Sequence, residues 1–498
     1  MSAERGFYRL YTMADIVLAT FNARYEHTAF GLRSLMANLR GLASSARMLE
    51  FTLETCVPEA LDAVLAEDPK IVGLGVYVWN ARLCLEFAAE LKNLRPDIVL
   101  VAGGPEISYE TEKQELSRVA DYVIAGEAEE VFAGLCGNLL SGNPPPRGTL
   151  KAGLQDLSVL ELPYSLYTAD DIANRTVYAE SSRGCPFGCD FCLSSLDHDA
   201  RYFPLEKLFV EWEKLMARGA LRFKFTDRTF NLDRARAAVI LKFFLDRYKP
   251  GLFLHLEMVP DRFPESLFPL IQKFPPGSLQ FEVGIQTFDE AVAARISRRQ
   301  DNRAAEANLA RLLKETAVYV HADLVAGLPG EDLAGFAAGF DRLYRLGPHE
   351  IQVGMLKKLR GAKIARHDAE WGMVYSPFPP YELRRNGLLD FDTVRRLRRF
   401  ARYWDLVANS GAFPEASKLI CGGASPFAGF MAFSDRLFAA TRATHSISRT
   451  RLREVISEYL LHALLLPEHD IAALMERDAL AASRSRGEKN ARQARREL

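Results

Sequence analysis

The sequence has no excess of charge of either sign. It contains 63 Lys and Arg against 64 Asp and Glu, a formal net charge of −1. Proteins that bind nucleic acid through its phosphates usually carry a basic surface, so we do not expect nucleic acid as a partner. The chain also lacks a run of about eighteen apolar residues, which a membrane-spanning helix needs. Residues 1–9 lack the apolar core of a signal peptide. We therefore expect a cytoplasmic protein that does not bind a membrane.

Cysteine is scarce, with 7 residues in 498, which argues against a scaffold held by disulfides. Cys185, Cys189 and Cys192 nevertheless lie together in the segment Arg-Gly-Cys-Pro-Phe-Gly-Cys-Asp-Phe-Cys. Three thiolates on one tight loop suit a single iron–sulfur centre. A 4Fe–4S cluster held by three cysteines keeps one iron open, as a catalytic metal site needs. A structural zinc site is the alternative, and its fourth ligand would have to be His198.

Residues 12–141 predict a domain in which strands and helices alternate. Apolar runs at 14–20, 47–52, 70–78, 97–102 and 121–125 predict the strands. This alternation indicates a parallel sheet, and such sheets bind ligands outside the carboxyl ends of their strands. The G-x-G-x-x-G pattern of a nicotinamide dinucleotide site is incomplete, because Val78 stands where the third glycine would be.

Four further segments follow this domain. Residues 142–173 predict a linker, because consecutive prolines at 144–146 stop both helix and sheet. Residues 174–362 predict six βα units, with their active site at the carboxyl ends of the strands. Those strands are expected at residues 176–182, 221–226, 252–258, 278–285, 318–325 and 350–355. Residues 363–482 predict a mostly helical domain, and 483–498 predict a basic disordered tail.

At the cysteine loop the chain resembles the radical S-adenosylmethionine enzymes. In that family the three cysteines hold a 4Fe–4S cluster and S-adenosylmethionine binds the open iron. An electron then cleaves S-adenosylmethionine to a 5′-deoxyadenosyl radical. The resemblance implies that residues 174–362 form a partial (β/α)6 barrel. It also implies contacts to S-adenosylmethionine from Phe191, Thr226, Asp227, Glu257, Gln286, Val325 and Gly327.

Several of these residues also have ordinary structural explanations. The Gly-Gly-Glu segment that relatives place after the second barrel strand is absent, and Thr226 and Asp227 stand there instead. Both residue types also cap helices. Gly327 also suits a simple turn. Their order after the cysteine loop is what supports a functional interpretation.

Residues 12–141 resemble the Rossmann-like cobalamin-binding domain that precedes the barrel in one class of these enzymes. The matching pieces are residues 22–27, 103–106 and 121–127. The resemblance implies that cobalamin contacts Asn22, Arg24, His27, Tyr77, Gly103, Gly104, Pro105, Gly126 and Glu127. His27 departs from the D-x-H-x-x-G motif of a cobalt ligand, because Tyr25 and Phe30 replace the Asp and the Gly. His27 is therefore either a cobalt ligand or an ordinary loop histidine.

The helical segment 363–482 resembles a C-terminal domain of unknown function found in one subfamily. Such a domain over the barrel mouth would shield a radical from water. Cys421 lies in this segment. It is either a hydrogen donor or a buried structural cysteine.

Together the resemblances imply a radical enzyme with a 4Fe–4S cluster, S-adenosylmethionine and cobalamin as cofactors. Its reaction would be methyl transfer to an unactivated carbon of a small-molecule or peptide substrate, with flavodoxin or ferredoxin as electron donor. The alternatives are radical cyclisation or rearrangement, methylthiolation of tRNA, and a non-catalytic cobalamin sensor. Methylthiolation is disfavoured because Cys84 and Cys136 fall within predicted helices and not on a second cluster loop. A sensor would leave the cysteine loop without a role.

Overall fold

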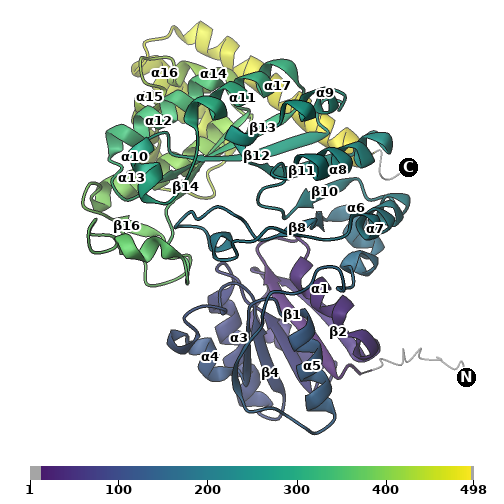
Figure 1. The fold of residues 1–498 in the computed structure, drawn as a ribbon. Coiled ribbons are helices and arrows are strands. Elements are labelled where there is room, and N and C mark those ends of the chain that lie inside the picture. The colour runs from purple at the N-terminus through teal and green to yellow at the C-terminus, as the bar shows by residue number, and fades with distance from the viewer. Residues whose placement is uncertain (1–12, 495–498) are drawn as a thin grey trace, which may run out of the picture. The chain divides into compact units, whose positions relative to one another are not determined.

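The chain forms two compact units in a computed structural model that describes residues 13–494. The first unit takes in the chain up to Ser181 together with Arg201–Ala220 and Leu359–Gly361. The second contains Ser182–Ala200, Leu221–Lys358 and the chain from Ala362. Figure 1 draws the sheet of the first unit in purple to blue and that of the second in teal to green. Residues 1–9, where no signal peptide is expected, and 495–498 lie outside the described residues. No helix within 13–494 is long and apolar enough to cross a membrane.

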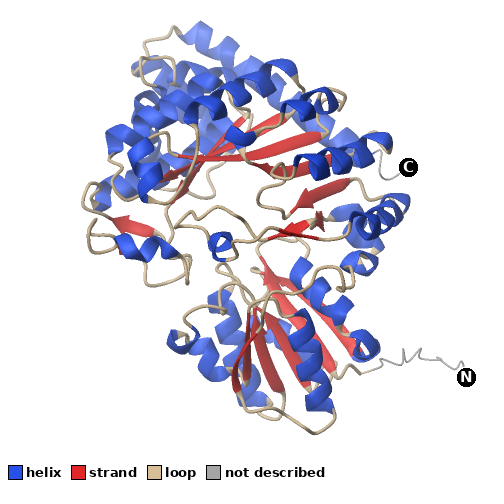
Figure 2. Cartoon of the chain, in the orientation of Figure 1, coloured by secondary structure: helices blue, strands red, loops and turns tan. Residues whose placement is uncertain are grey.

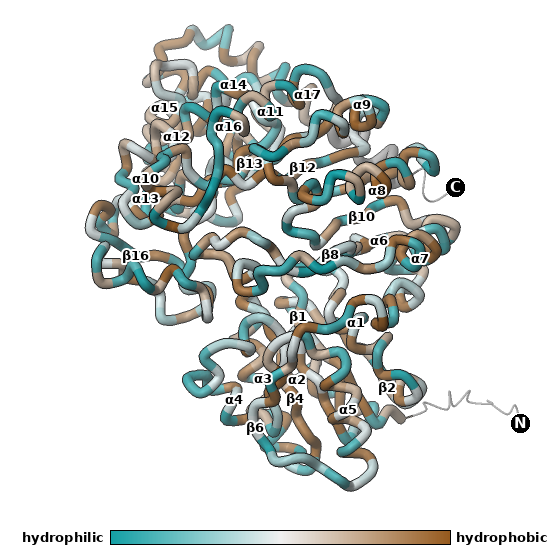
Figure 3. Tube along the Cα trace, viewed as in Figure 1, coloured by the Kyte–Doolittle hydropathy of each residue, from teal (hydrophilic) through white to brown (hydrophobic). Residues whose placement is uncertain are grey.

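A parallel six-stranded sheet forms the core of the first unit, in the order β2-β1-β3-β4-β5-β6. Its strands are β1 (Ile16–Asn22), β2 (Ala46–Thr52), β3 (Ile71–Gly75), β4 (Val99–Gly103), β5 (Tyr122–Ala125) and β6 (Gly148–Lys151). Every residue of β1 is buried, and the strands of this sheet run largely in the brown of hydrophobic residues in Figure 3. Continuous apolar strands are expected where helices cover both faces of a parallel sheet.

Helices cover both faces of this sheet (Figure 2). One face packs against α2 (Val57–Leu65), α3 (Ala81–Leu94) and α4 (Glu115–Val119). The other packs against α1 (Phe30–Asn38) and α5 (Glu129–Leu140). The predicted alternation of strands and helices is confirmed.

The segment predicted as a linker is partly regular structure. Gly148–Lys151 forms β6, the edge strand, and pairs with β5 through Tyr122↔Gly148 and Ala125↔Lys151. A 3₁₀ turn at Pro163–Leu166 and α6 (Ala169–Asn174) follow. We did not predict β6, because an exposed edge strand has no apolar run. Only its pairing with β5 identifies it as a strand. The first unit also contains β7 (Val177–Ala179), β9 (Arg201–Tyr202) and α7 (Leu205–Ala217).

A buried group of four charges ties α6 to the first sheet. Arg33 pairs with Glu50 at 2.6 Å and with Asp171 at 2.8 Å, and Arg175 pairs with the same two carboxylates at 2.8 Å. Burial alone would raise the pKa of Glu50 and of Asp171, but their contacts with the two arginines lower both. Glu50 also accepts a hydrogen bond from Asn22 at the end of β1, so these charges reach the edge where the strands end.

The second unit contains five parallel strands in the order β14-β13-β12-β11-β10. These are β10 (Arg222–Phe225), β11 (Phe253–Met258), β12 (Leu279–Gln286), β13 (Tyr319–Ala326) and β14 (Glu350–Met355). With β7, all six strands expected for the partial barrel are present. The helices between them are α8 (Arg234–Asp246), α9 (Phe268–Ile271), α10 (Glu290–Arg295), α11 (Asn302–Glu315) and α12 (Leu333–Leu346).

The C-terminal part is mostly helical, as predicted. A short hairpin of β15 (Val374–Tyr375) and β16 (Leu383–Arg385) precedes the helices α13 (Phe391–Trp404), α14 (Pro414–Ile420), α15 (Pro426–Thr441), α16 (Arg449–His462) and α17 (Glu468–Ala494). The expected disordered tail at 483–498 is instead helical as far as Ala494. The segment lacks proline and is rich in Ala, Arg, Glu and Lys, whose helix propensity outweighs the missing apolar stripe.

Replacing Arg33 should strongly destabilise the first unit. In Arg33→Leu two buried carboxylates lose a cation, which typically costs about 3–5 kcal/mol. The loss should shrink only as the pH falls below about 4, because the arginines lower the pKa of Glu50 and Asp171 in the folded protein and the cation is no longer needed once both are protonated. Thermal and urea unfolding at pH 7 and at about pH 3 measure both effects.

Arg82→Leu is the matched control, since Arg82 forms an exposed pair with Glu86 on α3. Exposed pairs of this kind contribute about 0.5 kcal/mol or less. Equal destabilisation by the two substitutions would contradict the role given to the buried group.

Candidate active site

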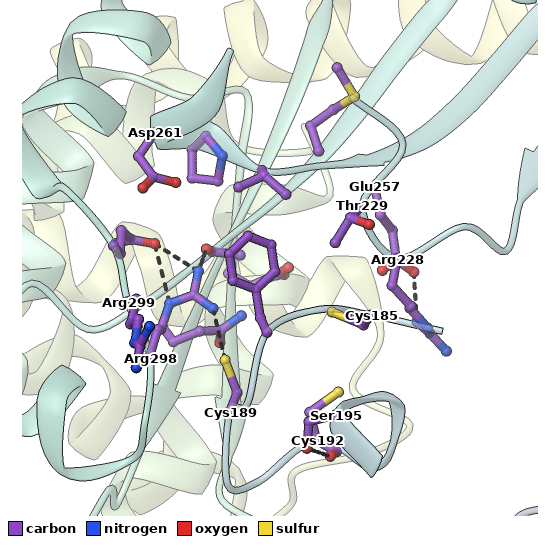
Figure 4. Close-up of a pocket in the computed structure, with 18 of the residues that line it drawn as sticks. Cys185, Cys189, Cys192, Ser195, Arg228, Thr229, Glu257, Asp261, Arg298 and Arg299 are labelled. Atoms are coloured by element: carbon purple, nitrogen blue, oxygen red, sulfur yellow. Dashed lines mark hydrogen bonds and ion pairs between the residues drawn. The ribbon is translucent and has the colours of Figure 1, made fainter. Parts of the chain in front are cut away.

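The three clustered cysteines lie on one loop and line one cavity of about 240 Å³. The loop follows β8 (Ser182–Arg183) and leads into a 3₁₀ turn at Leu193–Leu196. Cys185 and Cys189 are buried and Cys192 is partly exposed. Figure 4 shows the three cysteines together on the loop, among the other residues that line the cavity. The loop thus presents three sulfurs to a single space, as the spacing predicts.

A glycine with a positive φ shapes the start of the loop. Gly184 has a φ of +86°, and a Cβ there would collide with the carbonyl oxygen of Asp199. The returning chain is held close by a hydrogen bond of 2.9 Å from Cys185 N to Asp197 O. A larger residue at this position would push the two arms of the loop apart.

Arg298 contacts one of the cysteine sulfurs. Its Nη1 lies 3.7 Å from Cys189 Sγ, and its Nη2 donates to Gly284 O and to Gln300 Oε1. Burial raises the pKa of the Cys189 thiol, and the positive charge of Arg298 offsets part of that rise. A cation beside the sulfur favours the thiolate, which is the form that binds metal. No sequence motif points to Arg298, which lies after α10.

The donor set fits an iron–sulfur cluster better than a single ion. All seven cysteines, each within the described residues, are free. Among residues 13–494, no three His, Cys, Asp or Glu side chains converge closely enough to hold one metal ion. A cluster needs no such convergence, because each cysteine binds a different iron. His198, the candidate fourth zinc ligand, is exposed and lies 3.4 Å from Lys363 Nζ.

Three of the residues expected to contact S-adenosylmethionine line the cavity, namely Phe191, Glu257 and Gln286. Gln286 has a φ of +70° and follows a bulge in the β12–β13 pairing. Bulges of this kind redirect a side chain, and they are common beside active sites. Of the described residues, the other four, Thr226, Asp227, Val325 and Gly327, are not part of the cavity lining.

The segment after β10 reaches the cavity two residues later than expected. Asp227 is buried and accepts a hydrogen bond of 2.6 Å from Ser182 Oγ. Arg228 and Thr229 line the cavity instead, and Arg228 pairs with Glu257 at 2.7 Å. Asp227 thus holds the start of the cysteine loop, while Arg228 supplies a positive charge to the cavity.

Charged side chains fill the inner face of the second sheet. His255 Nε2 and Glu282 Oε2 are 2.8 Å apart, with Lys224 3.7 Å from the same carboxylate. His321 lies 3.1 Å from Asp323 and 3.3 Å from Glu350. Side chains alternate between the two faces along β11, β12 and β13, so these residues lie on one face. This alternation of polar and apolar residues is the sequence signal that could have identified them.

Burial and charge set the protonation of this inner face. Burial raises the pKa of Glu257 to about 7 despite the charge of Arg228. Burial alone would raise the pKa of Glu282, but His255 and Lys224 lower it to about 2. Burial alone would lower the pKa of His321, but its contacts with Asp323 and Glu350 raise it to about 10. At neutral pH the inner face of the sheet thus combines an anionic Glu282, a cationic His321 and a Glu257 near its midpoint. Of these three residues, Glu282 and Glu257 line the cavity.

The residues expected to contact cobalamin gather at one edge of the first sheet. Asn22 and Gly103 end β1 and β4, and Tyr77 and Gly126 follow β3 and β5. These four strands are neighbours in the sheet, so their carboxyl ends share an edge. Tyr77 stacks on Trp79 with ring centroids 4.5 Å apart, and Trp79 is 48% exposed. An aromatic pair with one exposed ring beside glycine-rich loops suits a large planar ligand. Trp79 itself was not predicted.

The remaining predicted cobalamin contacts have partners within the first unit. His27 Nδ1 lies 2.8 Å from Tyr178 OH, so one ring nitrogen is already engaged. Glu127 pairs with Arg201 and accepts a hydrogen bond of 2.7 Å from Gln155 N. Arg24 is exposed and lies 3.6 Å from Glu26. Pro105 follows Gly104, which has a φ of +111° and where a Cβ would collide with Val76 O. Cobalt ligation by His27 stays a prediction.

The other cysteines do not form a second cluster loop. Cys84 and Cys136 are buried within α3 and α5, where burial raises the pKa of both thiols. Cys56 is exposed before α2, and Cys421 is buried after α14. Cys84 and Cys136 therefore lie on different helices, as expected. This placement argues against tRNA methylthiolation, which would need a second cluster loop.

Three family models match successive parts of the chain. Residues 16–136 match the B12 binding domain, and 180–341 match the Radical SAM superfamily. Residues 369–496 match a protein of unknown function, DUF4080. The chain is a radical SAM protein with a B12-binding domain. The matches confirm the expected family and the three expected cofactors, cobalamin, a 4Fe–4S cluster and S-adenosylmethionine.

Curated relatives of this radical SAM protein are methyltransferases. The cobalamin-dependent radical SAM methyltransferase TokK of Streptomyces tokunonensis is 24% identical over 81% of this chain and 63% of TokK. The uncharacterized methyltransferase PH0819 of Pyrococcus horikoshii is 29% identical over 34% of this chain and 42% of that protein. This chain therefore spans less than two thirds of the length of either relative.

A solved structure shares the fold. The radical S-adenosylmethionine methyltransferase TsrM of Kitasatospora setae superimposes with a TM-score of 0.60. The match covers 72% of this chain and 76% of TsrM, at 19% sequence identity. This likeness confirms the order of a Rossmann-like sheet and a partial barrel.

The imidazole of His321 should stay protonated well above neutral pH. Its pKa of about 10 predicts that both ring nitrogens carry protons at pH 8, and that the charge is lost only as the pH approaches 10. Nitrogen-15 NMR of histidine-labelled protein measures this, with His321→Gln assigning the signal. A neutral ring at pH 8 would contradict the described contacts with Asp323 and Glu350.

Proposed function

We propose that this protein is a cobalamin-dependent radical SAM methyltransferase that methylates an unactivated carbon of a small-molecule or peptide substrate. The observation that carries the proposal is a cavity lined by Cys185, Cys189 and Cys192 in a chain that also has a B12-binding domain. TokK and TsrM, both named as methyltransferases, support methyl transfer as the reaction. Ring closure or rearrangement is the alternative outcome of the same radical chemistry.

The residues of the cavity divide into a cluster side and a cofactor side. Cys185, Cys189 and Cys192 would hold the 4Fe–4S cluster, whose electron, once the cofactors are bound, cleaves S-adenosylmethionine while cobalamin supplies the methyl group. Arg298 provides a fixed cation beside Cys189, suited to the carboxylate of S-adenosylmethionine. Glu257 and Asp323 also line the cavity and provide acceptors, and the ring of Phe191 provides an apolar surface.

The B12-binding domain would hold cobalamin at the carboxyl edge of its sheet. Asn22, Tyr77 and the loops at Gly103–Pro105 and Gly126–Glu127 form that edge. The glycines there let the backbone come close to a ligand, and the Tyr77–Trp79 pair offers a flat apolar face. We place the corrin on this edge.

The proposal predicts a sharp dependence on the cluster cysteines. After anaerobic reconstitution with iron, sulfide and hydroxocobalamin, the full-length protein should retain both an iron–sulfur absorbance and cobalamin. With S-adenosylmethionine and dithionite it should release 5′-deoxyadenosine. Cys189→Ala should lose both the cluster and 5′-deoxyadenosine formation, because a cluster with two protein ligands is poorly held.

Cys56→Ala is the matched control and should keep both, since Cys56 is exposed and remote from the loop in sequence. A cluster without retained cobalamin would contradict the B12 part of the proposal. Failure of the wild-type protein to assemble a cluster would contradict the whole of it. Mass spectrometry of product formed from deuterium-labelled methionine-methyl S-adenosylmethionine would distinguish methyl transfer from cyclisation once a substrate is found.

A further inference from the structure

Asp190 is a fully buried carboxylate between two of the cluster cysteines, with an exposed fraction of 0%. Its Oδ2 lies 2.8 Å from Arg366 Nη2 and 2.9 Å from His367 Nε2. Arg366 Nε also lies 3.2 Å from His367 Nε2, so the three side chains form one contact group. A charge this deeply buried is tolerated only where such partners meet it.

The backbone of Asp190 is held as firmly as its side chain. Its N–H donates to Ile296 O at 3.0 Å, and its carbonyl accepts from Ile364 N at 2.8 Å. Ile296 follows α10, and Ile364 belongs to the 3₁₀ turn at Lys363–His367. One residue thus joins the cysteine loop to two segments that are distant in sequence.

Arg366 closes this arrangement by bridging the same two segments. Its Nη2 donates to Arg295 O at 3.1 Å and to Ser297 Oγ at 2.9 Å, as well as pairing with Asp190. The next residue after Ser297 is Arg298, whose Nη1 contacts Cys189 Sγ. The contacts of Arg366 therefore hold both the loop that carries the cysteines and the arginine that touches one of their sulfurs.

The charges of this group lie next to the cluster ligands in sequence and space. A negative charge near a cluster opposes the addition of an electron and so lowers its reduction potential, and a positive charge raises it. Asp190 carries the negative charge and Arg366 the compensating positive charge. Neither residue lines the cavity. Both therefore act indirectly, by holding the cysteine loop in place and through the electric field of their charges at the cluster.

We propose that Asp190, Arg366 and His367 are positioning residues that hold the cluster loop, and that the Asp190–Arg366 pair sets the reduction potential of the cluster. The proposal rests on the proposed function in one respect, that the loop holds a 4Fe–4S cluster. It goes further by assigning control of the electron-accepting step to residues that do not line the cavity.

The test is a redox titration of the reconstituted full-length protein, followed by electron paramagnetic resonance of the reduced cluster. Asp190→Asn removes a negative charge and should raise the potential. Arg366→Gln leaves Asp190 uncompensated and should lower it. The double variant should return toward the wild-type value, because it removes one charge of each sign. Iron and sulfide per chain are measured for each protein.

An exposed pair of the same chemistry serves as the control. Asp392 and Arg395 form a 2.7 Å pair on α13, and Asp392→Asn and Arg395→Gln should leave the potential unchanged. A merely structural role for Asp190 and Arg366 would change cluster content or stability without shifts of opposite sign. Arg366 is half-exposed, so Arg366→Gln keeps the test available if Asp190→Asn does not fold.

Each result decides the matter. Opposite shifts with a restoring double variant support the proposal. Unchanged potentials in variants that hold full clusters, or shifts of the same sign, overturn it and leave the proposed function standing. Absence of a cluster in the wild-type protein overturns both.

Discussion

Parallel strand pairing decides where chemistry can occur in this protein. In each unit the strands β1 to β6, or β10 to β14, run in the same direction as their neighbours. All loops that follow strands therefore emerge at one edge of each sheet, and helices cover the faces. Asn22, Tyr77, Gly103 and Gly126, which we propose contact cobalamin, lie along one edge of the first sheet for this reason. Within the second unit, the same constraint brings Glu257 and Gln286 to one cavity.

Buried charge is the second organising feature, and it recurs at three places. At each place carboxylates are buried beside a basic side chain. The three groups are Glu50 and Asp171 with Arg33, Asp323 and Glu350 with His321, and Asp190 with Arg366 and His367. Such groups add little stability overall, but the loss of one member is costly because its partner stays buried. They therefore specify one arrangement of loops more strongly than apolar packing would. Two of the three lie beside the cavity or its cysteine loop.

Much of the fold and part of the site followed from local patterns. The strand at β14 was predicted with its observed bounds, and the cysteine loop was found from spacing alone. The edge strand β6 and the helical end of α17 were not foreseen, because neither has an apolar pattern of its own. Arg228 and Arg298 were also missed, since an arginine shows its role only through what it contacts.

The sequence by itself determined the three-cysteine loop, the alternation of strands and helices, and the order of the domains. These depend on residue spacing and on apolar periodicity, which are local properties. Only the tertiary structure decided that Asp190 meets His367, that Arg298 meets Cys189 and that Asp227 turns away from the cavity. Those contacts join residues far apart in the chain, and their partners are chosen by how the strands, turns and loops pack and not by any pattern in the sequence.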